Sequence, residues 1–359
     1  MGSIKEALTF DDVLMLPRYS NILPADTNIS LSLSNKINLK VPFLSSAMDT
    51  VTESKMAIAI AKAGGIGIIH RNLKIKNQSN EIKKVKRKDY FVGAAIGTNK
   101  EDLERARSLS DSGVDLIVID TAHGHSAKVL KTLSKIKKIN SKISICVGNI
   151  ATGEAAKKLY NSGADIIKVG IGPGSICTTR MVAGIGVPQI SAIMEVKKAL
   201  NKKEIKIISD GGIKFSGDIA KAIAAGADAI MMGSIFAGTD ESPGKKFKIN
   251  GKSFKQYRGM GSIGAMSSGS ANRYFQKNYK DKSKFVPEGV EGRVEYKGSV
   301  SKIIYQLQGG LRSSMGYIGA KNLNELKRKA KFIKITKAGF YESMVHSVEM
   351  TQKSINYKL

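Results

Sequence analysis

The chain has 359 residues, 42% of them hydrophobic, which is enough for one large α/β domain or for two ordinary domains. Its 58 lysines and arginines outnumber its 30 aspartates and glutamates and give it a net charge of +28. With two cysteines, no run of about 18 apolar residues and no apolar signal-peptide core at its start, it is expected to be a soluble, cytoplasmic protein without a disulfide framework.

Eight short apolar runs follow one another along the chain, separated by spacers of helix length. They span residues 41–46, 65–69, 91–96, 115–120, 143–148, 165–170, 205–210 and 228–233. Uninterrupted apolar runs indicate strands covered on both faces, and the amphipathic stretches 101–111 and 151–161 are typical of the helices between such strands. We therefore predict an α/β fold, a (β/α)8 TIM barrel of parallel strands.

Three predicted helices end in similar sequences, in which Gly113, Gly163 and Gly226 each precede a small apolar residue and an aspartate. Glycine at this position is typical of a helix that ends in a left-handed residue. The weak internal repeat agrees with a barrel built from repeated strand and helix units.

The stretch GPGSICTTR, residues 172–180, places Cys177 in a glycine-rich loop directly after the sixth predicted strand. A thiol in an accessible polar loop is a candidate nucleophile, and the bare backbone groups of glycines can bind an ion. The alternative is a tight turn that holds an inert cysteine. Cys146, inside the run 143–148, is expected to be a buried strand residue.

Two further loops should lie beside Cys177. Asp210-Gly211-Gly212 ends the seventh predicted strand, and Gly233-Ser234 ends the eighth. Active sites of such barrels lie at the carboxyl ends of the strands, where loops after strands seven and eight often bind phosphate. For residues 210–212 alone, an ordinary turn is the alternative.

The loop sequence GPGSICTTR followed by MVAGIGVPQ resembles the catalytic loop of the IMP dehydrogenase family. The similarity runs almost from end to end of the chain. Its other segments are LTFDDVLMLP, SSAMDTVTE, VGAAIGT, SDGGI, MMGSIFAGTDESPG, YRGMGS and EGVEGRV.

The resemblance implies NAD-dependent oxidation of IMP to XMP, a step of guanine nucleotide biosynthesis. Cys177 would attack C2 of IMP, a hydride would pass to NAD⁺, and water would hydrolyse the covalent thioimidate. The implied catalytic residues are Cys177, Thr179, Arg273, Tyr274 and Glu288.

The resemblance also implies the residues that contact the two ligands, with Asp210 suited to accept hydrogen bonds from ribose hydroxyls. The IMP-binding positions are Ser46, Met48, Ser175, Asp210, Gly211, Gly212, Gly233, Ser234, Tyr257, Arg258, Gly259, Met260, Gly261 and Glu288. The NAD-binding positions are Asp120, His123, Asn149, Gly170, Ile171 and Gly172. For His123, a simple loop histidine is the alternative.

In the family a potassium ion is held by loop carbonyls, and oxygen ligands suit such a hard cation. The implied ligands are Gly172, Gly174 and Cys177, with Glu342, Ser343 and Met344 donated by a neighbouring subunit. This arrangement implies a homotetramer.

Residues 259–298 form a glycine-, serine- and charge-rich segment too long for an ordinary loop. By resemblance it is a mobile flap that brings Arg273 and Tyr274 into the site after NADH leaves. Arg273 would then act as the base that activates water. Because a guanidinium is almost always protonated, Thr179 with Glu288 is a second proton route, and a purely orienting Arg273 remains an alternative.

Family members typically carry a tandem cystathionine-β-synthase-type regulatory domain after the second barrel strand. Here the chain runs straight through residues 81–93, so that insertion is absent at about residues 85–90, and residues 1–359 are expected to form one catalytic barrel domain.

Two other functions remain as alternatives. GMP reductase is a shorter barrel enzyme with a similar cysteine loop and the opposite redox sense, but MVAGIGVPQ, YRGMGS and the flap pair Arg273-Tyr274 favour the dehydrogenase. The positive net charge also suggests, as an alternative, a non-enzymatic RNA-binding protein. Since the lysines are scattered, with few aromatic residues among them, a nucleic-acid partner is not expected.

Overall fold

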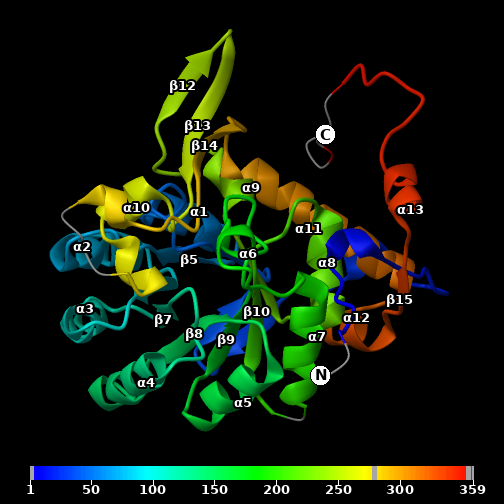
Figure 1. Ribbon diagram of the computed structural model, residues 1–359. Coiled ribbons are helices and arrows are strands. Elements are labelled where there is room, and N and C mark those ends of the chain that lie inside the picture. The colour runs from blue at the N-terminus through cyan, green and yellow to red at the C-terminus, as the bar shows by residue number, and fades with distance from the viewer. Residues whose placement is uncertain (1–3, 202, 277–280, 353–356, 358–359) are drawn as a thin grey trace.

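The computed structural model describes residues 4–201, 203–276, 281–352 and 357. Eight parallel strands close into a barrel in the order β10-β11-β4-β5-β6-β7-β8-β9 (Figure 1). They are β4 (Phe43–Ser45), β5 (Ile66–Ile69), β6 (Val92–Ile96), β7 (Leu116–Asp120), β8 (Ser144–Ile150), β9 (Ile166–Val169), β10 (Lys206–Asp210) and β11 (Ala229–Met232). The predicted α/β barrel is confirmed.

Alternate residues of each strand pack into two separate cores. Ile66 and Ile68 face the barrel interior, whereas Ile69 packs against the surrounding helices. The amino-terminal end of the barrel is closed by the hairpin of β2 (Leu31–Ser34) and β3 (Ile37–Leu39), which contributes Leu33, Ile37 and Leu39 to the interior core. The barrel is therefore filled with side chains, and only its other end is open to a ligand.

Helices surround the barrel between the strands (Figure 1). They are α1 (Ser54–Lys62), α2 (Ile75–Lys86), α3 (Lys100–Asp111), α4 (Ala127–Ile139), α5 (Gly153–Asn161), α7 (Gln189–Ala199), α8 (Ser216–Ala225) and α11 (Val300–Ile318). The predicted glycine ends are confirmed, since Gly113, Gly163 and Gly226 follow α3, α5 and α8 with φ of +85°, +92° and +126°. Other residues rarely adopt that backbone conformation.

The segment around the mouth has more structure than its sequence suggests. The strands β12 (Lys246–Ile249), β13 (Lys252–Arg258) and β14 (Glu291–Glu295) form a sheet that projects beside the barrel (Figure 1). The predicted flap 259–298 therefore includes a sheet strand. It also holds α10 (Ile263–Ser267) and the 3-10 turns η3 (Ser270–Tyr274) and η4 (Lys282–Lys284). Its residues 277–280 lie outside the described residues.

The remaining elements lie near the two ends of the chain or on short loops. Strand β1 (Val13–Met15) pairs antiparallel with β15 (Phe332–Lys334), which ties the two ends of the chain together. The others are η1 (Phe10–Asp12), η2 (Pro24–Asp26), α6 (Thr179–Val182), α9 (Ser234–Ala237), α12 (Leu323–Lys329) and α13 (Lys337–Glu342).

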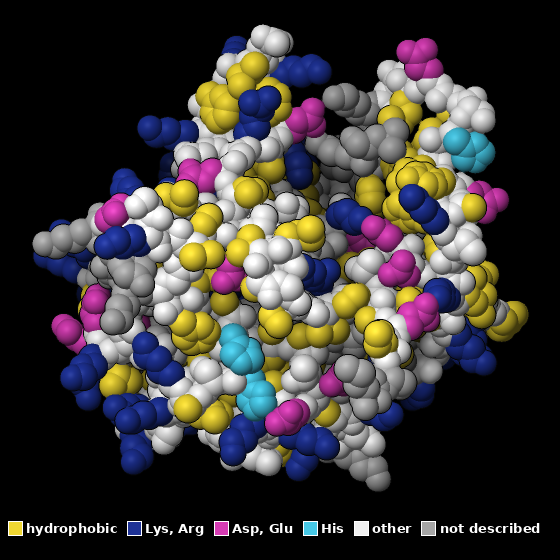
Figure 2. All heavy atoms as spheres, in the orientation of Figure 1, with side chains coloured by type: hydrophobic (Ala, Val, Ile, Leu, Met, Phe, Trp, Pro, Cys, Tyr) yellow, Lys and Arg dark blue, Asp and Glu magenta, His cyan; other side chains and the backbone are white. Residues whose placement is uncertain are grey.

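Lysine and arginine side chains are spread around the edge of the visible face instead of forming one patch (Figure 2). This distribution agrees with a solvated basic surface. Among the described residues, no helix is both long and apolar enough to span a membrane.

Candidate active site

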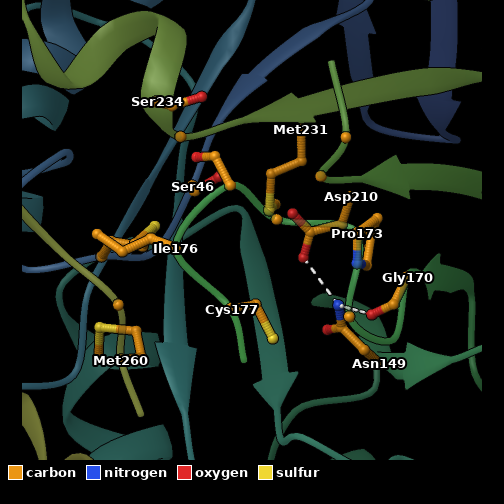
Figure 3. Close-up of a pocket in the computed structure, with 18 of the residues that line it drawn as sticks. Ser46, Asn149, Gly170, Pro173, Ile176, Cys177, Asp210, Met231, Ser234 and Met260 are labelled. Atoms are coloured by element: carbon orange, nitrogen blue, oxygen red, sulfur yellow. Dashed lines mark hydrogen bonds between the residues drawn. The ribbon is translucent and has the colours of Figure 1, made fainter. Parts of the chain in front are cut away.

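A cavity of about 320 Å³ opens at the carboxyl ends of the barrel strands, a volume at the lower end of the range for small-molecule sites. Cys177 lines it, and Figure 3 shows its side chain facing the same space as Asp210 and Asn149. The other predicted site residues on its wall are Ser46, Met48, Asp120, Gly170, Gly172, Gly174, Ser175, Gly211, Gly212, Gly233, Ser234, Tyr257, Gly259, Met260, Arg273, Tyr274 and Glu288.

The cysteine loop is held by backbone hydrogen bonds to the segment that precedes β14. Thr178 N–H donates to the carbonyl of Glu288 at 3.0 Å, and Val290 N–H donates to the carbonyl of Ile176 at 3.1 Å. The Cys177 thiol donates to Thr179 Oγ1 at 3.2 Å. The thiol is thus fixed in an accessible position beside a hydroxyl, as a nucleophile requires.

Arg180 also supports this loop, although it was not predicted as a site residue. Its Nη2 donates to the carbonyl of Val187 at 2.7 Å, and its side chain packs over Gly172, where a Cβ would lie 2.5 Å from Arg180 Cγ. Burial lowers the pKa of Arg180. The guanidinium joins the start and the end of the loop, so it stabilises the conformation that presents Cys177.

Part of the cavity wall is a cradle of three glycines, Gly211, Gly212 and Gly233, which have no side chains of their own. A Cβ on Gly233 would lie 3.1 Å from both Met48 Sδ and Tyr257 Oη. Gly211 and Gly212 have φ of +91° and +83°, so they expose their backbone groups in a turn that other residues rarely adopt. Burial raises the pKa of Tyr257, which keeps its hydroxyl a hydrogen-bond donor. Such a cradle suits a phosphate group.

Lys168, which also lines the cavity, is a buried ammonium that was not predicted as a site residue. Its Nζ donates to Asp120 Oδ1 at 3.0 Å, to Asp210 Oδ2 at 2.8 Å and to Asn149 Oδ1. Asn149 Nδ2 in turn donates to Asp210 Oδ2 at 2.9 Å, as Figure 3 shows. A lysine inside the otherwise apolar strand β9 was the available signal, because a buried charge needs partners.

Two flap residues, Arg273 and Tyr274, also line the cavity. Arg273 forms an ion pair with Oδ2 of Asp120. The backbone carbonyl of Arg273 accepts a hydrogen bond from Ala122 N–H at 2.9 Å. Tyr274 packs against Gly261, where a Cβ would lie 2.7 Å from its ring. Burial lowers the pKa of Arg273 and raises that of Tyr274. In this structure the flap therefore occupies part of the mouth.

Some predicted site residues do not line the cavity. Arg258 turns away to pair with Asp49 at 2.6 Å, and that carboxylate raises its pKa. Thr179 lies outside the cavity wall and contacts the site through the hydrogen bond that its Oγ1 accepts from the Cys177 thiol. His123 is exposed beside His125 in the loop after β7. The others outside the wall are Gly261, Ile171, Glu342, Ser343 and Met344.

The second cysteine is separate from the site. Cys146 belongs to the barrel interior core, as predicted, and burial raises its pKa to about 12. It is therefore protonated and unreactive at neutral pH. Among the described residues, no cluster of three His, Cys, Asp or Glu side chains could hold a metal ion.

Comparison with known proteins agrees with this geometry. The family model for the IMP dehydrogenase / GMP reductase domain matches residues 7–346. Inosine-5'-monophosphate dehydrogenase of Cryptosporidium parvum is 48% identical, over 99% of this chain and 98% of the relative. The protein of that name from Borreliella burgdorferi is 48% identical over 96% and 98% of the two chains. That from Aquifex aeolicus is 42% identical over 99% and 98%, in an alignment of 483 positions.

Proposed function

The chain belongs to the IMP dehydrogenase / GMP reductase family, and we propose that it is the enzyme that oxidises IMP to XMP with NAD⁺. The observation that carries this proposal is the place of Cys177. Its thiol lines one cavity with the glycine cradle of Gly211, Gly212 and Gly233 and with the carboxylate of Asp210. A nucleotide with its phosphate in the cradle and its ribose hydroxyls at Asp210 brings its base to the cysteine.

The proposed reaction has two steps that share this cavity. The thiol of Cys177 loses its proton to solvent and its sulfur adds to C2 of the purine. The hydrogen on C2 then departs with its electron pair, leaving a thioimidate. NAD⁺ supplies the hydride acceptor. Water then adds to C2 and the carbon–sulfur bond breaks, which returns the thiol and yields XMP.

For the second step we propose that Arg273 orients the attacking water. Burial lowers the pKa of its guanidinium, but the ion pair with Asp120 opposes loss of its proton. Thr179 lies 3.2 Å from the Cys177 sulfur, and Glu288 lines the same cavity. These two residues provide the proton route, with Thr179 as the relay and Glu288 as the acceptor.

The residues at the mouth fit an oxidised nicotinamide. Oδ2 of Asp120 pairs with Arg273 of the flap, and Asn149 Nδ2 donates to the carbonyl of Gly170 at 2.7 Å. A carboxylate there suits either a sugar hydroxyl or a cationic ring. We place the cofactor against Asp120, Asn149 and residues 170–172, with His123 outside the cavity near its adenine end.

The cysteine loop also fits a potassium ion. Among the described residues, no donor reaches the carbonyls of Gly172 and Cys177, while that of Gly174 accepts a hydrogen bond from Cys177 N–H at 3.1 Å. Free carbonyl oxygens are the ligands of hard cations. These three residues would hold the ion with Glu342, Ser343 and Met344 of a neighbouring subunit. The ion would stabilise the loop.

Because the proposed potassium ligands come from two subunits, we propose a homotetramer. From the proposed oxidation of IMP we propose a cytoplasmic location. We further propose that the chain is one catalytic domain whose family's regulatory insertion is missing. In support, α2 ends at Lys86 and a short turn through Asp89 leads directly to β6. The alignment with the Aquifex relative is longer than this chain, so that relative carries additional sequence.

The test measures NADH absorbance at 340 nm with IMP and NAD⁺, beside a reaction with GMP and NADPH. The proposal requires NADH formation in the first and no oxidation of NADPH in the second. Activity only with GMP and NADPH would establish GMP reductase instead. Oligonucleotide binding at physiological salt with neither activity would indicate the RNA-binding alternative.

A further inference from the structure

The carboxylates of Asp120 and Asp210 and the ammonium of Lys168 form a small buried group, here named the mouth charge cluster. Side-chain exposure is 5% for Asp120, 16% for Asp210 and 2% for Lys168. Their strands β7, β9 and β10 all end at the mouth, so strand register fixes the three charges in place. Asn149, from β8, adds hydrogen bonds but no charge.

The cluster by itself is not neutral. Two carboxylates and one ammonium leave one formal negative charge. Arg273 balances this charge by pairing with Oδ2 of Asp120. Arg273 belongs to the flap, so flap opening removes this cation from the cluster. An uncompensated charge in a poorly hydrated site is costly, and the cluster then favours another cation in the same position.

The cofactor offers such a cation in only one of its two redox states. The oxidised nicotinamide ring carries one positive charge, and acceptance of a hydride makes it neutral. In the proposed function the ring must lie beside C2 of the purine, in the cavity that Cys177, Asp120 and Arg273 all line in this structure. Arg273 and the oxidised ring therefore compete for one negative site, whereas the reduced ring has no charge with which to compete.

We propose that the mouth charge cluster senses the redox state of the cofactor. It holds NAD⁺ by its charge, loses that attraction when the hydride is transferred, and then attracts Arg273, so that chemistry itself promotes release of NADH and closure of the flap. This inference rests on the proposed function. It assigns a selective role to Asp120 and a positioning role to Lys168, which fixes both carboxylates.

The experiment measures binding without turnover. In the Cys177→Ala, Arg273→Ala double variant saturated with IMP, dissociation constants for NAD⁺ and NADH are determined by isothermal titration calorimetry. With the competing arginine removed, NAD⁺ is expected to bind roughly tenfold or more tightly than NADH. Adding Asp120→Asn, which makes the cluster neutral, is expected to bring the two constants within about threefold of each other.

Two further variants separate charge from structure. Asp120→Glu keeps the charge and is expected to keep most of the preference. Asp115→Asn removes a carboxylate that pairs with Lys86 just before β7, at the opposite end of that strand, and is expected to change nothing in the ratio. If circular dichroism shows that Asp120→Asn is unfolded, the parent double variant still decides the question.

Equal affinities in the parent, or a preference that survives Asp120→Asn, would overturn the inference. This result is distinct from failure of the proposed function. If the proposed function is wrong, the unaltered chain will form no NADH from IMP and NAD⁺, and the inference will then be wrong as well.

Discussion

Arg273 of the flap is ion-paired with Asp120 at the end of β7, two residues 153 positions apart in the chain that meet across the cavity mouth. Asp120 also binds Lys168 at 3.0 Å. The pair therefore connects residues 259–298 to the charged side chains of the cavity wall.

Replacement of the nucleophile should abolish turnover but not binding. For Cys177→Ala we expect kcat to fall by at least roughly a thousandfold, while the dissociation constant for IMP changes little, because the phosphate cradle and Asp210 belong to other loops. Steady-state kinetics and calorimetry measure the two quantities. An active Cys177→Ala enzyme would refute the assignment.

Cys146 provides the control for that experiment. Burial raises its pKa to about 12, so its thiolate fraction rises only as the pH approaches that value, and iodoacetamide at pH 8 should label Cys177 alone. IMP should protect Cys177 from labelling, and Cys146→Ala should remain active. Peptide mass spectrometry identifies the labelled residue. Labelling of Cys177 that IMP fails to slow would contradict its assignment as the nucleophile in the IMP site.

The cradle should not tolerate a methyl group. In Gly233→Ala the new Cβ would lie 3.1 Å from Met48 Sδ and Tyr257 Oη, so these side chains must give way slightly and the methyl group takes up space in the cradle. We expect KM for IMP to rise by roughly tenfold or more, with a smaller change in kcat. Gly217→Ala is the matched control, because its Cβ would meet nothing within 4 Å. Similar KM values for the two variants would argue against the cradle.

Activity should depend on a monovalent cation of potassium size. No donor in the described part of the chain reaches the carbonyls of Gly172 and Cys177, and a bound ion would fix the cysteine loop through them. After exchange into lithium we expect turnover to fall by roughly tenfold or more and to recover on addition of potassium. Equal initial rates in the two salts would exclude this role.

The flap arginine should act after hydride transfer. For Arg273→Ala we expect a rapid burst of NADH, about one equivalent per active site, followed by turnover roughly a hundredfold slower than normal. Stopped-flow absorbance measures the burst, and intact-protein mass spectrometry should detect the nucleotide adduct on Cys177. Loss of the burst itself would mean that Arg273 acts earlier.

Glu288→Gln tests the second proton route in the same assay. If Thr179 and Glu288 carry the proton while Arg273 only orients water, the double variant with Arg273→Ala should lose more activity than either single variant. A double variant no slower than Arg273→Ala alone would exclude an independent route through Glu288.

The barrel could be predicted from local patterns in the sequence. Each strand is buried on both faces, so its apolar run is continuous, and Gly113, Gly163 and Gly226 mark helix ends because only glycine readily adopts their positive φ. Those signals are local. The loop of Cys177 could be recognised for the same reason, since its glycines and its cysteine are adjacent in the chain.

Which charged side chains meet depends on how the strands are arranged in space. Lys168 is a single lysine in an apolar strand, and its partners Asp120, Asn149 and Asp210 come from three other strands that barrel closure brings together. Arg258 lies in a stretch predicted to bind substrate, yet it pairs with Asp49, because a nearby carboxylate stabilises a partly buried guanidinium. Long-range electrostatic partners depend on distance in space, which no local sequence pattern encodes.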